Sequence, residues 1–128
     1  MDMSKAWVML SPGEIADRIS VLELKKKKGF DVEKELNDFK TAFNSLGYLK
    51  DISDLRHELD KINALAWDKI DRIYEMFESE KFVNFVETFT VCREAHFLNK
   101  ERVITKNKIS EMMGCKEQEQ KSWKPSTI

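Results

Sequence analysis

The feature that most constrains this chain is an apolar stripe between positions 55 and 77. Its members follow one another at steps of four and three residues: Leu55, Leu59, Ile62, Ala66, Ile70, Ile73 and Phe77. An α-helix turns once in 3.6 residues, so this spacing places all of these side chains on one face of a helix. The pattern therefore predicts one long helix that starts near Asp51.

Capping residues and glycines predict a helix on the N-terminal side of this stripe. Ser11 fits an N-cap, Pro12 the first helical position, and Glu14 a capping-box carboxylate that bonds the Ser11 amide. Lysines and a glycine then close the segment, as positive charge and glycine commonly do at a helix C-terminus. We expect this helix to run from Ser11 to near Lys28.

Two more helices are predicted around the long one. The second would begin after Asp31 as its N-cap and stop at Gly47, with Leu36, Phe39, Phe43 and Leu46 on its stripe. The last would run from Phe82 to Met113 and end at Gly114. On it Cys92 follows Phe85 and Phe89 at helical spacing, which predicts a small core residue.

Long helices with short connections favour antiparallel packing. We therefore expect an all-α protein, either an antiparallel helical bundle or a long helical hairpin with the capped N-terminal helix laid across it. A parallel coiled-coil dimer is the alternative, and apolar surface left on the long helices favours a homo-oligomer. The 128 residues fit a single domain, with 1–10 as an extension and 115–128 as a polar tail.

Charge and composition exclude several classes of function. Lys and Arg number 22 against 23 acidic residues, so the net charge of −1 gives no basis for binding nucleic acid or a membrane surface nonspecifically. No apolar run approaches a membrane span, and the start MDMSKAWVML lacks the features of a signal peptide, so a cytoplasmic location is expected. The two cysteines and two histidines lack metal-site spacing, and no phosphate-binding loop appears, so no metal or cofactor is expected.

Three of the predicted helices carry rows of mixed polar residues. Glu14, Arg18 and Lys25 follow one line of the first helix with Asp17 beside them, Asn63, Trp67 and Asp71 are spaced by four, and Asn99, Arg102 and Lys106 interrupt the apolar stripe of the last helix. If the rows converge, the basic groups would surround a cavity for an anion or a nucleotide-like ligand, with Trp67 as a stacking surface. The alternative is a ladder of surface ion pairs of little individual value.

The same rows resemble an uncharacterised family, a domain of unknown function, of short bacterial and phage proteins. The resemblance covers residues 10–123 and rests on SPGEIADRISVLELK at 11–25, the Asn63, Trp67 and Asp71 row, the Asn99 to Lys106 row, and EQKSW at 119–123. Carried over by position, it also marks Ser11, Gly13, Glu23, Glu119, Lys121 and Trp123. The candidate ligand-binding residues are Glu14, Asp17, Arg18, Lys25, Asn63, Trp67, Asp71, Asn99, Arg102, Lys106, Lys121 and Trp123.

The chain departs from the family pattern at several positions. Ile70 and Lys100 stand where the family has acids, Ala66 where it has Leu, and Trp123 where it has Tyr. The loss of two acids weakens an acid–base mechanism and leaves a more basic pocket, which favours binding without turnover.

Three functions are therefore in competition. The first is a small-molecule binding protein for an anionic nucleotide-like ligand; the family's occurrence in phages suggests a sponge that sequesters a nucleotide signal of host immunity. The second is a protein–protein interaction module in which the long helix docks a partner helix. The third is a small hydrolase or transferase acting on a nucleotide or nucleotide-sugar, with Glu14, Asp17 or Asp71 as general base.

Overall fold

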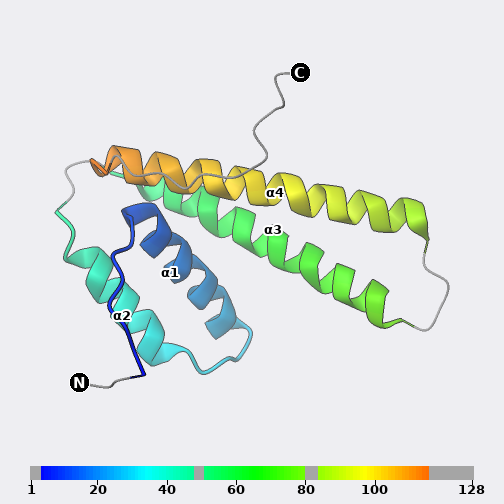
Figure 1. Ribbon diagram of the computed structural model, residues 1–128, viewed down its shortest axis with the longest axis horizontal. Helices are drawn as coiled ribbons and strands as arrows, with labels where there is room; N and C mark the ends of the chain where they lie inside the picture. Colours follow the sequence, from blue (N-terminus) through cyan, green and yellow to red (C-terminus); the bar gives the residue numbers. More distant parts are fainter. Residues whose placement is uncertain (1–3, 48–50, 80–83, 116–128) are drawn as a thin grey trace.

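The computed structural model describes residues 4–47, 51–79 and 84–115, which form helices and no strand (Figure 1). The helices are α1 (Pro12–Lys27), α2 (Glu33–Asn44), α3 (Ser53–Glu78) and α4 (Phe85–Met112). The all-α prediction is confirmed. None of these helices is both long enough and apolar enough to cross a bilayer.

α3 and α4 pack side by side along their length and run in opposite directions (Figure 1). Lys69 Nζ lies 2.5 Å from Glu94 Oε2, and further along α3 the guanidinium of Arg72 pairs with Glu87. As the residue number rises from 69 to 72 on α3, the partner on α4 falls from 94 to 87, so the two helices are antiparallel. At 1.5 Å per residue, 26 and 28 residues make a helical hairpin about 40 Å long.

α1 lies against one half of this hairpin, and α2 packs on α1 (Figure 1). A continuous cluster of buried apolar side chains joins all four helices and includes Ile19 of α1, Leu36 of α2, Leu59 of α3 and Ile109 of α4. We call this covered half the proximal half and the remainder, toward the α3–α4 connection, the distal half. This four-helix cluster lies in the proximal half, whereas in the distal half Met76 and Val91 are buried.

α1 begins where the sequence predicts. The Ser11 side chain accepts a hydrogen bond from the Glu14 amide at 3.3 Å, and Pro12 occupies the first turn. The capping-box prediction is wrong for the carboxylate, because among the described residues Glu14 pairs with Lys106 and Arg18 rather than with the Ser11 amide. Its charge joins α1 to α4 instead of closing the helix end.

Other predicted boundaries shift by a few residues. The N-cap of α2 is Val32 rather than Asp31, and α2 ends at Asn44, before Gly47. At the start of α3, Ser53 donates to the Asp51 carboxylate from its amide and its hydroxyl, which lowers the pKa of Asp51. Gly114, at φ 84°, ends α4 as predicted, whereas Phe82 lies outside the described residues.

The prediction of a buried Cys92 is wrong, because Cys92 is exposed. Ile70 and Phe77, which complete the apolar stripe of α3, are also exposed. These residues lie in the distal half, beyond the reach of α1 and α2. Helical spacing predicted the face correctly, but it carried no information on how far along the hairpin that face would be covered.

Candidate functional site

The candidate site is centred on Asp17 of α1, whose side chain is only 1% exposed. Arg102 of α4 donates hydrogen bonds to both carboxylate oxygens, with its Nε 2.8 Å from Oδ1 and a second N–H directed at Oδ2. Asn63 of α3 donates from Nδ2 to the same Oδ1 at 3.0 Å. One buried carboxylate thus receives hydrogen bonds from two other helices, through the paired geometry that makes Arg–carboxylate contacts strong.

Lys106 extends this cluster by one turn of α4. Its ammonium lies 2.6 Å from Glu14 Oε2 and 3.8 Å from Asp17 Oδ2, and its side chain is 8% exposed. Arg18 approaches Glu14 from the outer side at 3.4 Å and is itself half exposed. The cluster therefore alternates in sign across the α1–α4 contact, as buried charges require in order to be retained in a protein interior.

Gly13 allows α1 to approach α4 this closely. Its amide donates to Ser110 Oγ at 2.8 Å, and a Cβ at position 13 would overlap the Lys106 carbonyl oxygen and lie 2.7 Å from Ser110 Oγ. Only glycine fits this backbone contact. The sequence P-G-E therefore starts the helix and also brings its first turn against α4.

The polar groups of the cluster are fully paired. Asn63 Nδ2 donates to Ser20 Oγ at 3.0 Å in addition to Asp17, and among the described residues no buried side-chain nitrogen or oxygen lacks a partner. A complete network of this kind holds its members in one geometry, whereas a partly satisfied one would be costly. It provides a rigid wall for the adjoining pocket.

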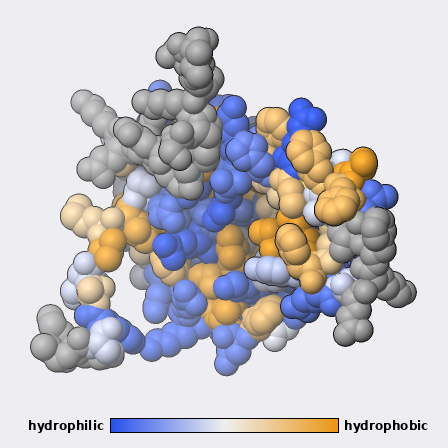
Figure 2. Space-filling model, turned by 45° about the vertical axis from the view of Figure 1, so that its right-hand side comes forward, coloured by the Kyte–Doolittle hydropathy of each residue, from blue (hydrophilic) through white to orange (hydrophobic). Residues whose placement is uncertain are grey.

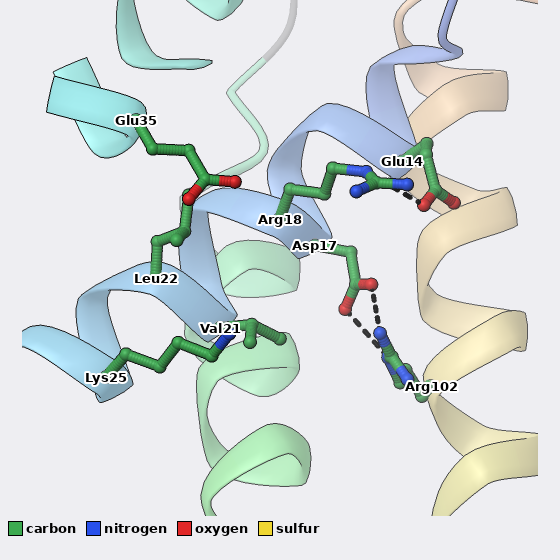
Figure 3. A pocket seen from close by; sticks show the side chains of 8 residues that line it. All are labelled: Glu14, Asp17, Arg18, Val21, Leu22, Lys25, Glu35 and Arg102. Carbon is green, nitrogen blue, oxygen red and sulfur yellow. Dashed lines mark hydrogen bonds and ion pairs between the residues drawn. The ribbon is translucent and has the colours of Figure 1, made fainter. Parts of the chain in front are cut away.

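A pocket of about 220 Å³ opens beside this network, between α1, α2 and α4 (Figure 3). Figure 3 shows Glu35 entering from α2 and Arg102 from α4, with the α1 side chains between them. Its lining consists of Glu14, Asp17, Arg18, Val21, Leu22, Lys25, Glu35 and Arg102. The surface combines cations and carboxylates around a small apolar floor.

The cations of this lining differ in availability. Arg102 is 33% exposed and is held by Asp17, so its charge is already matched. Lys25 is half-buried in the pocket wall, and within the part of the chain that the structure describes no carboxylate lies at ion-pairing distance from its ammonium. The Lys25 ammonium is therefore the donor most available to an incoming anion, with Arg18 two turns away on the same helix.

The structure gathers only some of the predicted site residues. Glu14, Asp17, Arg18, Lys25 and Arg102 line the pocket, and Asn63 and Lys106 support it from behind. Asn99 is half-buried one turn before Arg102 on α4. Lys121 and Trp123 lie outside the described residues.

Trp67 and Asp71 do not join the pocket. Trp67 packs with Phe30 at 6.4 Å between ring centroids and carries Lys28 Nζ 5.2 Å from its ring, whereas Asp71 is exposed. Four residues advance a helix by about 40° more than one full turn, so a row spaced strictly by four rotates off its starting face. Asn63 faces α1, Trp67 lies at the edge and Asp71 points away.

Sequence reasoning missed three residues of the site. Ser20 and Ser110 are buried acceptors in the network, and Glu35 supplies the pocket wall on α2. Ser110 continues the Lys106 row at a spacing of four, which was an available signal. No sequence signal could have singled out Glu35, since it is one acid among several near the start of α2.

No protein-family model matches this chain, and searches of curated proteins and of solved structures also found no match. The resemblance to the uncharacterised bacterial and phage family therefore stays a prediction.

Proposed function

We propose that this protein binds a small anionic molecule of the nucleotide-like class in the pocket between α1, α2 and α4, and releases it unchanged. The observation that carries the proposal is the half-buried Lys25, which lines the pocket and has no counter-ion among the described residues. A phosphate or carboxylate group on a ligand would supply that counter-ion through charge-assisted hydrogen bonds.

The size of the pocket supports capture of one end of a ligand. A volume near 220 Å³ is smaller than the 300–1,000 Å³ of typical drug-sized sites. The anionic group would be enclosed between Lys25 and Arg18, and the remainder would lie along the surface. The aromatic residues of the described ranges lie outside this pocket, so none of them would stack a base inside it.

Binding fits the network better than catalysis does. A general base must be able to accept a proton from the reacting group. The carboxylates of Glu14 and Asp17 are engaged by Lys106 and Arg102, and Asp71 is exposed on another face. The hydrolase or transferase function therefore ranks below binding.

In this proposal the four helices act as one helical bundle whose α1–α3–α4 packing holds the pocket wall. Sequestration of a host immune nucleotide by a phage protein is an extension of the same proposal. That extension rests on the family resemblance alone.

The test is a binding measurement on matched lysine variants. Isothermal titration would use inorganic phosphate, a nucleoside monophosphate and a nucleotide-sugar as probes, against wild type, Lys25→Met and Lys27→Met. Both lysines lie in the last turn of α1, so both variants lose the same favourable charge at the helix C-terminus. Lys27 lies outside this pocket.

We expect at least one probe to bind wild type and Lys27→Met equally and to bind Lys25→Met about tenfold more weakly, since a charge-assisted hydrogen bond contributes about 1.5–3 kcal/mol. Equal affinity in all three proteins, or no binding of any probe, would contradict the proposal. Arg102→Ala is a poorer probe, because it also removes the partner of a buried carboxylate.

A further inference from the structure

Within the described ranges, one face of the α3–α4 hairpin is covered by α1 in its proximal half and exposed in its distal half. On α4 this face follows a row at steps of four and three: Phe85, Phe89, Cys92, His96, Asn99, Val103, Lys106 and Ser110. Val103, Lys106 and Ser110 are buried, and the last two contact α1. Phe85 and Phe89 are 79% and 68% exposed.

α3 shows the same change along its length. Leu59 and Asn63 are buried on the side that faces α1, whereas Ile70, Tyr74 and Phe77 continue that side into solvent, and Phe77 is 71% exposed. We call the five exposed residues Ile70, Tyr74, Phe77, Phe85 and Phe89 the distal face. Figure 2 shows apolar side chains gathered on the side of the molecule that carries the distal half.

The length of α1 explains why the distal face is uncovered. With 16 residues α1 is about 24 Å long, whereas the 28 residues of α4 span about 42 Å. α1 begins beside Ser110 at the proximal end, so it is too short to reach Phe89. Among the described residues no other helix lies over the distal half (Figure 1).

The distal face is also held in a fixed shape. The ion pairs Lys69–Glu94 and Arg72–Glu87 join α3 to α4 within this half, and Thr88 Oγ1 contacts Met76 Sδ at 3.7 Å. Because Met76 and Val91 are also buried in this half, the two helices are held in one register and the distal face is a preformed surface. Little ordering would be needed before another surface docks on it.

The area of the distal face approaches that of one side of a standard interface. Large aromatic side chains each bury about 150–250 Å² when fully covered, so these five residues expose on the order of 600 Å². A standard interface buries about 800 Å² per partner, and the largest patch on a typical monomer is about 300–600 Å². A second copy of the same face would therefore come close to completing an interface, with half-buried neighbours at its edge.

We propose that two copies of this chain associate through their distal faces about a two-fold axis, so that the two hairpin ends form a four-helix layer. A two-fold interface uses the same patch on both subunits, which a single apolar face of two helices can satisfy. The net charge of −1 opposes this approach only weakly. The pocket beside Asp17 lies in the other half and stays open in such a dimer.

The test compares two phenylalanines of α4 that lie on different sides of the helix. Phe89 is in the distal face, whereas Phe97, which is also exposed, shares the outer side with Ile104 seven residues later. Full-length wild type, Phe89→Glu and Phe97→Glu would be measured by sedimentation equilibrium over a wide concentration range, with circular dichroism to confirm that each variant is helical.

We expect wild type and Phe97→Glu to sediment at twice the 15.1 kDa chain mass, and Phe89→Glu to raise the dimer dissociation constant by at least about 30-fold, as for the central residues of an interface. A wild-type protein that stays at 15.1 kDa at every concentration would overturn the proposal. So would a Phe89→Glu variant that dimerises as wild type does. A second pair, Phe77→Glu against Ile104→Glu, covers the case in which Phe89→Glu fails to fold.

Discussion

The two halves of the α3–α4 hairpin differ in what one face of α4 carries: charged and hydroxyl side chains are buried on it beside α1, whereas large aromatic side chains are exposed on it further along. Where α4 is covered by α1, the row carries Val103, Lys106 and Ser110, and Arg102 lies beside it. Where no other described helix lies over the row, it carries Phe85 and Phe89. The comparison teaches that the polarity of a helix face does not by itself reveal whether the fold covers that face.

The free energy of burying charge and of exposing apolar surface is handled differently in the two halves. In the proximal half, burial of charge is compensated because Asp17 meets Arg102 and Asn63 at hydrogen-bonding distance. In the distal half, none of the other described helices offsets the cost of the exposed apolar area. Substitutions should therefore act on folding in the proximal half and on association in the distal half.

The largest expected effect is that of Arg102→Ala in the proximal half. It leaves the Asp17 carboxylate buried without its main partner, which should lower the free energy of unfolding by about 3–5 kcal/mol. Urea unfolding followed by circular dichroism measures this change. A loss below about 1 kcal/mol would mean that the Asp17–Arg102 pair behaves as an ordinary surface ion pair.

Gly13→Ala should destabilise the same half somewhat less. The new Cβ would overlap the Lys106 carbonyl oxygen, so α1 must shift away from α4 at a cost of about 1–3 kcal/mol. Gly47→Ala is the control, because a Cβ at position 47 meets no atom within 4 Å. Equal stability of the two variants would show that α1 does not approach α4 this closely.

Asn63→Ala tests the link from α1 to α3. It removes donors to Asp17 Oδ1 and Ser20 Oγ and should lower the free energy of unfolding by about 1–2 kcal/mol. Hydrogen exchange of the α1 amides should increase at the same time, since α1 loses one of its anchors. Unchanged exchange in α1 would mean that Arg102 and Lys106 hold that helix without help from α3.

Arg72→Ala in the distal half should have the smallest effect. Arg72 pairs with Glu87, whose carboxylate raises the pKa of Arg72, but both groups are exposed to solvent. Screening by water makes such pairs weak, and added salt should reduce the remaining difference from wild type. Destabilisation as large as that of Arg102→Ala would remove the contrast between the two halves.

Local sequence patterns were enough to predict the helices and several of their ends. The 3.6-residue period of the apolar stripe, the Ser11 cap and Gly114 each act within a few residues of themselves, so no distant contact is needed to interpret them. The rows of Glu14 and Arg102 could likewise be recognised as polar interruptions. Their convergence was a hypothesis that spacing alone could not decide.

The tertiary structure decided which of these rows meet and which faces are covered. It brought Asp17, Asn63 and Arg102 together, set Trp67 and Asp71 outside the pocket, and left Cys92 and Phe77 exposed. The physical reason is that helix periodicity specifies direction around an axis, whereas burial depends on where a second helix begins and ends along it. The length of α1 and its position against the hairpin therefore determine how far along α3 and α4 the side chains are buried.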